Sequence, residues 1–205
     1  MNPKVVGTRG WVLIRKLAHE GLTDGWVLAG GTGLALQLGH RLSRDLDFFG
    51  RRDFDGVRLA DSLAGVAPVT VLGRSSGTLH VTLAGTRLSF LRLQRPLLFR
   101  GTPYRGIVVA DPLDIAVMKV LAIGGRGSRR DFVDLHFFIR SGGSLESVFR
   151  LIRRRFKGLD FNEYHLLRSL AYFDDAESEP MPRMLRRASW AEIKRAITAE
   201  VNRLS

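Results

Sequence analysis

The stretch that decides the fold is WVLAGGTGLALQLGHRLSRDLDFF, residues 26–49. Its first four residues are apolar and bounded by glycines, which predicts a short buried strand, residues 26–29. Apolar residues then recur at helical spacing from 32 to 39, so the strand is expected to pass through a glycine turn into a helix. Glycines let the backbone approach a ligand closely, and the first turn of a helix attracts phosphate. We therefore expect Gly30, Gly31 and Thr32 to line a phosphate cradle.

The end of the same stretch, residues 45–49, predicts a second strand with two carboxylates on one face. Side chains alternate along a strand, so Asp45 and Asp47 share one face and the apolar side chains take the other. Aspartate is depleted in strands, so this pair favours a functional explanation. Two carboxylates that face a phosphate cradle suit Mg²⁺, with Mn²⁺ as a substitute, because such ions take a few carboxylates plus phosphate oxygens and waters. The alternative is two solvent-facing strand ends beside an ordinary turn.

A helix is expected to begin after Asp111, which can cap it, with Pro112 in its first turn. Gly124 and Gly125 are typical of its end. Lys119 then lies beside the apolar face of this helix. Periodicity alone favours an ordinary exposed lysine at this position.

The next helix has Ser128 as its expected cap, and its first turns contain Asp131 and Asp134. Arg130 is spaced to reach Asp134 at i, i+4. Acids in a first turn complement the helix dipole without any catalytic role, so both explanations stay open. The arginines around the cap can hold phosphates or can be solvated: Arg126, Arg129 and Arg130.

These motifs resemble those of the AbiEii/AbiGii toxin family. The similarity consists of Gly-Gly-Thr at 30–32, His-Arg-x-Ser-x-Asp-Leu-Asp-Phe-Phe at 40–49, Lys119, and the run from Arg126 to Leu135. It implies an α+β fold: a minimal nucleotidyltransferase-type mixed sheet flanked by helices, followed by a helical C-terminal half. It also implies transfer of a nucleotide from an NTP, in some members onto the acceptor end of tRNA, and an antitoxin encoded alongside.

The resemblance also implies roles at matching positions. Asp45 and Asp47 would bind the metal, Lys119 the triphosphate, Thr32 would lie near the phosphates, and Asp131 would be a further essential acid. Arg41 is expected either to pair with Asp45 or to meet the triphosphate. The candidate catalytic residues are thus Asp45, Asp47, Lys119 and Asp131, and the candidate nucleotide-binding residues are Gly30, Gly31, Thr32, Arg41, Ser43, Lys119, Arg126 and Arg130.

One position departs from the pattern of this fold. Nucleotidyltransferases commonly place a third carboxylate on a later strand, and in the corresponding stretch, residues 86–92, Ser89 stands there instead. Deprotonation of the acceptor hydroxyl would then fall to another acid, with Asp131 and Asp134 as candidates, or to the metals, or the activity would be weak. His80 lies in an alternating stretch, where a lone histidine is more often an ordinary strand residue than a ligand.

Composition bounds the partners and the organisation. The chain has 205 residues, 45% of them hydrophobic, enough for one bilobal unit or two small domains. We expect a nucleotidyltransferase domain over residues 1–100 and a helical domain over 101–205, joined by the connector 96–106. The net charge of +12 favours a polyanionic partner such as RNA. Without cysteines, a membrane-length apolar run or a signal peptide, a cytoplasmic protein is expected.

The remaining elements are read from periodicity and caps. Helices are expected at 11–19, 55–63, 144–156, 160–173 and 189–203, and two or three strands within 68–93. Two capping boxes support the last two helices, Asp160 with Glu163 and Ser189 with Glu192. The basic tract at 150–157 is either a solvated helix face or an edge that contacts RNA, and residues 174–179 are expected as an acidic loop.

Two other functions share the central motif. A nucleotidyltransferase that modifies aminoglycosides would need an acidic cleft for a cationic substrate, which the net charge of +12 does not favour. A non-catalytic module that binds nucleic acid or a partner protein is the other alternative, and Ser89 is its main support.

Overall fold

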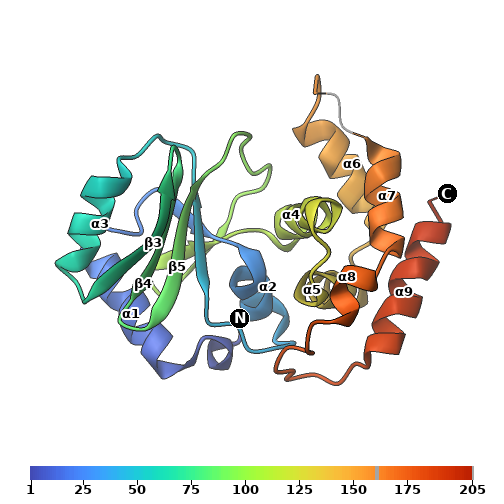
Figure 1. Cartoon of the computed structure of the whole chain (residues 1–205), viewed down its shortest axis with the longest axis horizontal. Helices are drawn as coiled ribbons and strands as arrows, with labels where there is room; N and C mark the ends of the chain where they lie inside the picture. Colours follow the sequence, from blue (N-terminus) through green and yellow to red (C-terminus); the bar gives the residue numbers. More distant parts are fainter. Residues whose placement is uncertain (160–161, 205) are drawn as a thin grey trace.

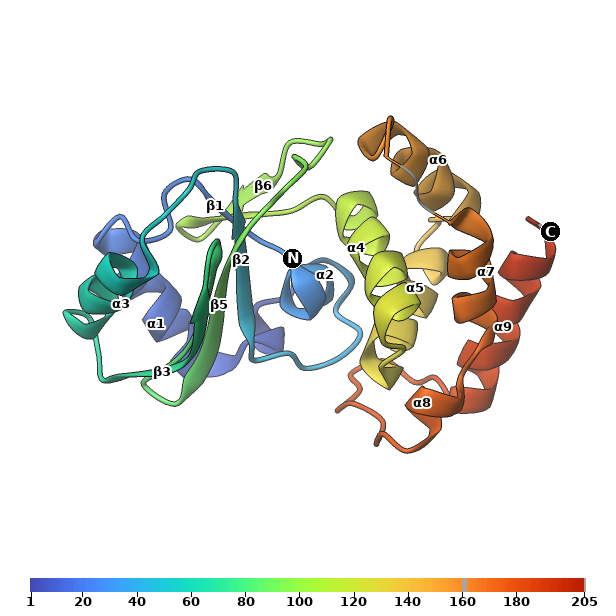
Figure 2. The ribbon, with the colours of Figure 1, turned by 45° about the horizontal axis from the view of Figure 1, so that its top comes forward.

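The computed structural model describes residues 1–159 and 162–204, which form a sheet-containing lobe and a helical lobe (Figure 1). The first lobe holds a mixed seven-stranded sheet in the order β3-β4-β5-β2-β1-β7-β6. Its strands are β1 (Trp26–Leu28), β2 (Leu46–Gly50), β3 (Val69–Ser75), β4 (Thr78–Leu83), β5 (Thr86–Arg92), β6 (Thr102–Tyr104) and β7 (Ile107–Val109). The expected mixed sheet followed by helices is confirmed (Figure 2).

Helices flank this sheet and build the second lobe. The first lobe contains the 3-10 turn η1 (Pro3–Val5), α1 (Gly7–His19), α2 (Gly30–Leu38) and α3 (Gly56–Ala64). The helical lobe contains α4 (Pro112–Gly125), α5 (Arg129–Arg140), α6 (Leu145–Arg155), α7 (Glu163–Ala171), the short α8 (Asp174–Glu177) and α9 (Trp190–Asn202). Among residues 1–159 and 162–204, no helix has the length and apolarity needed to cross a bilayer.

The predicted passage from strand to helix lies at the centre of the molecule. Strand β1 ends at Leu28, and α2 begins at Gly30, two residues earlier than the periodicity suggests. Gly30 has φ +58°, a backbone conformation that glycine adopts without strain. In Figure 1, α2 lies between the sheet and α4.

The second strand alternates as its sequence predicts. Leu46 and Phe48 are fully buried in the core that α1 and α3 form with the sheet. Asp47 lies on the opposite face, because neighbouring side chains of a strand point to opposite sides. Strand β2 pairs in parallel with β5, and β5 pairs antiparallel with β4, so three adjacent strands share the face of Asp47.

The start of the second half differs from the prediction. The stretch expected as a connector, 96–106, contains strand β6 and turns into β7, which pairs in parallel with β1. Pro103 hides the strand signal, but β6 lies at the edge of the sheet, where proline is tolerated. The sheet therefore ends at Val109, beyond residue 100, and the division into two domains stays a prediction.

Helix α4 is the centre of the helical lobe. It contacts α2, α5, α6 and α7, so almost every side of it is buried, including the position of Lys119. The acidic segment expected as a loop contains α8 instead. The cap expected at Asp160 lies outside the described residues, and Asn162 caps α7. The capping box of Ser189 and Glu192 is confirmed.

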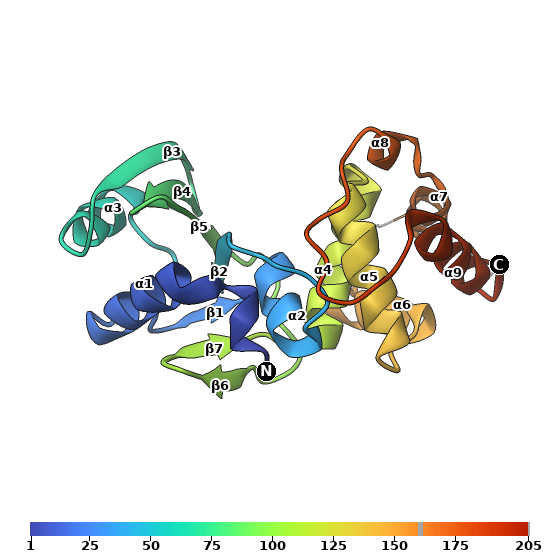
Figure 3. The same cartoon turned by 90° about the horizontal axis from the view of Figure 1, so that it is seen from below.

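The segment between α8 and α9 returns to the first lobe. Leu42 donates a backbone hydrogen bond to the carbonyl of Arg183 (2.8 Å), and Leu185 donates one to the carbonyl of His40 (2.8 Å). Arg41 and Met184 form an antiparallel bridge between these contacts. Figure 3 shows this segment running from α8 toward the end of α2 before it reaches α9. We call residues 183–186 the strap.

Candidate active site

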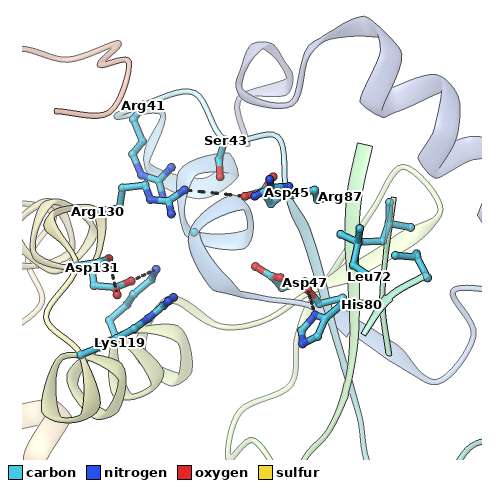
Figure 4. A pocket seen from close by; sticks show the side chains of 16 residues that line it. Arg41, Ser43, Asp45, Asp47, Leu72, His80, Arg87, Lys119, Arg130 and Asp131 are labelled. Atoms are coloured by element: carbon cyan, nitrogen blue, oxygen red, sulfur yellow. Dashed lines mark hydrogen bonds and ion pairs between the residues drawn. The ribbon is translucent and has the colours of Figure 1, made fainter. Parts of the chain in front are cut away.

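A cavity of about 520 Å³ lies between the two lobes, and most of the expected site residues meet in it. One wall comes from the sheet lobe and the other from α4, α5 and the loop between them (Figure 4). Seven of the expected residues lie around its polar centre: Gly31, Arg41, Ser43, Asp45, Asp47, Lys119 and Asp131. Arg126 and Arg130 line its helical side, whereas Gly30 and Thr32 lie outside the lining.

The sheet wall presents Asp45 and Asp47. Asp47 packs directly against Gly30: a Cβ atom at Gly30 would lie 2.6 Å from Asp47 Oδ2. Glycine at position 30 thus makes room for the carboxylate as well as for the turn. The side chain of Asp45 is 48% exposed, and its Oδ2 lies 3.9 Å from Arg130 Nη1.

Thr32 holds the loop that precedes β2. Its buried hydroxyl is hydrogen-bonded to the Ser43 hydroxyl (2.7 Å) and to the backbone carbonyl of Asp45. A carbonyl can only accept, so Thr32 donates to Asp45 and accepts from Ser43. Ser43 and Asp45 reach the cavity, and the side chain of Thr32 fixes them from behind.

The helical wall is built around Asp134, which is fully buried. Arg41 donates to both of its oxygens, from Nε (2.6 Å) and Nη2 (2.8 Å), and His40 Nε2 lies 2.8 Å from Oδ1. Lys119 Nζ lies 2.7 Å from Oδ2. Two expected pairs are therefore wrong: Arg41 pairs with Asp134 and not with Asp45, and Arg130 points to Asp45 and not to Asp134.

Glycine 31 belongs to this arrangement. A Cβ atom at Gly31 would collide with Arg41 Nη2 and would come within 3.3 Å of Asp134 Oδ2. The two glycines of the turn therefore admit one charged side chain each, Asp47 at Gly30 and Arg41 at Gly31. This close approach explains the glycine pair before any phosphate is considered.

The buried charges of this wall compensate one another. Burial alone would raise the pKa of Asp134, but Lys119 and Arg41 outweigh it and hold that pKa well below the ordinary value. Burial likewise opposes the charged form of Lys119, yet Asp134 and Asp131 raise its pKa above the ordinary value. Lys119 is thus a buried, charged side chain at the cavity, and the expectation of an exposed lysine from periodicity is wrong.

Asp131 uses both oxygens within the protein. Oδ1 lies 2.7 Å from Lys119 Nζ, and Oδ2 accepts a hydrogen bond from Ser128 Oγ (2.8 Å). Ser128 begins α5 without the side-chain cap bond that the sequence predicts, and its hydroxyl goes to Asp131 instead. Asp131 and Asp134 are therefore both paired with cationic side chains of the protein.

Sequence reasoning assigned no role to His80, which the structure brings to the sheet wall. Asp47, Ser89 and His80 stand in register across β2, β5 and β4, and His80 Nδ1 lies 3.1 Å from Ser89 Oγ. The hairpin turn at Ala84 and Gly85 was the available signal, because it pairs position 80 with position 89. Figure 4 shows Asp47 and His80 beside each other on this wall.

Asp45 and Asp47 fit a divalent cation. Burial raises the pKa of Asp47, a hydrogen bond from Ser89 and the charge of Lys119 oppose that rise, and the nearby carboxylate of Asp45 adds to it. A cation between the two would remove this repulsion. Within the described residues, no three His, Asp or Glu side chains are grouped to hold a metal ion. Phosphate oxygens and waters would then complete the coordination, as is usual for Mg²⁺.

The arginines of the helical lobe divide into two groups. Arg126 and Arg130 line the cavity, whereas Arg129 turns away and donates to the backbone carbonyls of Ala176 (2.8 Å) and Glu177 (2.9 Å). The basic tract on α6 is also partly engaged by other groups of the protein. It contains the buried Arg155, bound to the carbonyl of Arg95 (3.0 Å), and the ion pairs Arg150–Glu146 (2.6 Å) and Arg153–Glu163 (2.9 Å).

A family profile described as the nucleotidyl transferase AbiEii toxin of type IV toxin–antitoxin systems matches residues 11–85 and 84–203. An uncharacterized protein of Aquifex aeolicus is 36% identical over 171 residues, which cover 81% of this chain and 82% of that protein.

Two solved structures share the fold. A putative nucleotidyltransferase from Helicobacter pylori superposes with a TM-score of 0.61 at 18% identity, over 100% of this chain and 96% of that one. MenT4, a nucleotidyltransferase toxin of Mycobacterium tuberculosis, superposes with a TM-score of 0.57 at 18% identity, over 94% and 82% of the two chains.

Proposed function

Because the chain belongs to the AbiEii family of nucleotidyl transferase toxins, we propose that it transfers a nucleoside monophosphate from an NTP to the end of an RNA, with tRNA as the favoured acceptor. Membership of this family makes the chain a nucleotidyltransferase and the toxin of a toxin–antitoxin pair, and so implies an NTP substrate and an antitoxin partner. The observation that supports the proposed transfer to RNA is one cavity with Asp45 and Asp47 on one wall and Lys119, Arg126 and Arg130 on the other.

In this proposal, each wall takes one part of the nucleotide. Lys119, Arg126 and Arg130 bind the triphosphate, and Ser43 and Gly31 border it from the turn. Asp45 and Asp47 hold Mg²⁺, which when bound stabilises the negative charge that develops on the phosphates. Asp131 keeps the ammonium of Lys119 in place through their 2.7 Å contact. Positioning and charge supply most of the catalysis in such transfers.

A groove beside the cavity supports an RNA acceptor. It encloses about 530 Å³ and shares Asp45 and Arg87 with the cavity, so the two are adjacent. Arg9, Arg44 and Arg87 line it and are exposed. In the part of the chain that the structure describes, none of these three side chains has an ion-pair partner. Free guanidinium groups along a groove suit a phosphodiester backbone that leads its end to the cavity.

Labelling of RNA tests the reaction. The purified protein is incubated with total RNA, Mg²⁺ and each α-³²P NTP in turn, and a parallel sample contains EDTA. We expect label on RNA with one preferred NTP, and at least a 1,000-fold lower rate for Asp45→Asn, Asp47→Asn, because both metal ligands are lost (roughly the effect of removing a main electrostatic group). The matched control is Asp24→Asn, Asp61→Asn, which removes two exposed carboxylates outside the cavity.

Label that persists in the double variant would contradict the assignment of the site. Absence of label on RNA with the intact protein would contradict the proposed reaction.

Paired arginine variants test the acceptor groove. Arg9→Ala, Arg44→Ala is expected to weaken RNA binding about 10-fold and to lower the salt dependence by about two charges, because each phosphate contact contributes roughly one. Arg150→Ala, Arg154→Ala removes the same charge from α6 and should have little effect. Fluorescence anisotropy with a labelled tRNA at several salt concentrations measures both. A larger loss from the α6 variant would place the acceptor on the other basic surface.

A further inference from the structure

The proposed reaction needs an acceptor for the proton of the attacking hydroxyl. The aspartates at the cavity and directly behind it already have other partners or roles. Asp45 and Asp47 are the proposed metal ligands. Asp131 accepts from Lys119 and Ser128, and Asp134 accepts from Arg41, His40 and Lys119. The expectation that Asp131 or Asp134 replaces the third carboxylate therefore has no support in the geometry.

His80 stands on the sheet wall beside these groups. It lines the same cavity as Asp47 and Lys119, and its strand is two strands away from β2 in the sheet. Its ring is half-buried, and its Nδ1 lies 3.1 Å from Ser89 Oγ. Among residues 1–159 and 162–204, Nε2 of His80 has no hydrogen-bond partner.

The chain of hydrogen bonds from Asp47 determines which nitrogen of His80 carries the proton. Ser89 stands in register beside Asp47, and a carboxylate can only accept, so the single hydroxyl proton of Ser89 is directed to Asp47. The oxygen of Ser89 must then accept its second hydrogen bond, and the donor is the N–H at Nδ1 of His80. In the neutral imidazole, which carries a single proton, Nε2 of His80 is then the nitrogen whose lone pair is available.

We infer that His80 is the catalytic base of the transfer, held in its active tautomer by Ser89 and Asp47. This inference rests on the proposed function. In the step, the oxygen of the acceptor hydroxyl bonds to the α-phosphorus, and the bond from that phosphorus to the β-phosphate oxygen breaks. Pyrophosphate leaves with the electron pair of that bond. The hydroxyl proton moves to Nε2 of His80, which becomes imidazolium and later returns the proton to water.

Ser89 is thus part of the site and explains the missing third carboxylate. A carboxylate at position 89 would accept the proton directly from the same wall. A serine at position 89 instead orients a histidine one strand further away, in register with it. In the inferred mechanism, His80 takes the place of the third carboxylate as the base, and Ser89 is the residue that positions His80.

The first test reads the tautomer without any reaction. In ¹⁵N NMR spectra of the metal-free, full-length protein, the ring of His80 should be protonated at Nδ1 and unprotonated at Nε2. The signal is assigned by its loss in His80→Asn. A ring protonated at Nε2 alone would overturn the inference, because Nε2 could then accept no proton.

The second test uses kinetics. His80→Asn keeps a donor toward Ser89 but lacks Nε2, and we expect its kcat to fall by about 100-fold or more, as for loss of a general base, with NTP affinity unchanged. Imidazole added to His80→Gly should raise the kcat of that variant by about 10-fold or more. The change Ser89→Asp, made in addition to His80→Asn, should raise the kcat above that of His80→Asn alone. The control His19→Asn changes a histidine at the end of α1 and should behave as the intact protein.

These outcomes separate the two proposals. If the intact protein labels RNA but His80→Asn is equally fast, the base is not His80 and the proposed function stands. A slow His80→Gly that imidazole does not accelerate also overturns the assignment, since a purely structural loss is not rescued by a base. If the intact protein itself transfers no nucleotide, the proposed function fails, whereas the tautomer of His80 can still be measured.

Discussion

The two walls of the cavity treat electric charge in opposite ways. On the helical wall, Asp134 and Lys119 are buried, and each has partners of opposite charge within 2.8 Å. On the sheet wall, Asp45 and Asp47 face the cavity with little compensation, and burial raises the pKa of Asp47. A balanced wall contributes to stability and keeps its shape, whereas an unbalanced wall stores a negative charge that a cation can neutralise. Charge on the first wall serves the fold, and charge on the second is available to the metal ion that we propose.

Asp134→Asn should break the balanced wall and have the largest effect on stability. It leaves the buried Arg41 and Lys119 short of one negative charge, which typically costs about 3–5 kcal/mol. Asp114→Asn is the matched control. Asp114 is equally buried, but it accepts hydrogen bonds from the backbone N–H groups of Leu98 and Phe99, which an amide oxygen can also accept, and its cationic neighbour Arg155 lies at 3.9 Å instead of at hydrogen-bond distance. Urea unfolding of both variants measures the difference.

The dependence of stability on pH should show the same contribution of Asp134. The pKa of Asp134 is lowered on folding, so its contribution is present above the unfolded value of 3.8 and is lost as pH falls through the folded value. The intact protein should therefore lose stability below that pH more steeply than Asp134→Asn. A variant within about 1 kcal/mol of the intact protein would show that the helical wall is not held by this charge.

Asp47→Asn should change the stability only slightly, and in the opposite direction. It removes a carboxylate whose charged form is disfavoured by burial, so the metal-free variant should be as stable as the intact protein or more stable by about 1 kcal/mol. Mg²⁺ should raise the melting temperature of the intact protein and leave that of the variant unchanged, because only a bound ligand stabilises the folded state. If Asp47→Asn were as destabilising as Asp134→Asn, the two walls would not differ.

The local part of the site could be predicted from the sequence. The order strand, glycine turn, helix and strand depends on neighbouring residues, and so does the alternation that separates Asp47 from Leu46 and Phe48. The capping box of Ser189 and Glu192 is equally local. These features are visible because their partners lie within a few positions of one another.

The rest depends on contacts that no local pattern encodes. Arg41 and Asp134 are 93 positions apart, and nothing near Arg41 distinguishes that partner from Asp45, four residues away. Lys119 lies on a helix whose periodicity suggests solvent, because its buried neighbours come from other helices. Strand β6 was missed because Pro103 argues against a strand, and only the edge position makes it tolerable.

The strap also sets the order in which the site can be completed during synthesis. A chain leaving the ribosome presents the turn, the two aspartates and Lys119 well before residues 183–186 exist. His40 and Leu42, on either side of Arg41, gain their backbone partners in the strap only when most of the helical lobe has been made. The nascent protein therefore holds the residues of the proposed site while the segment carrying Arg41 still lacks these backbone partners, and the strap supplies them once it has been translated.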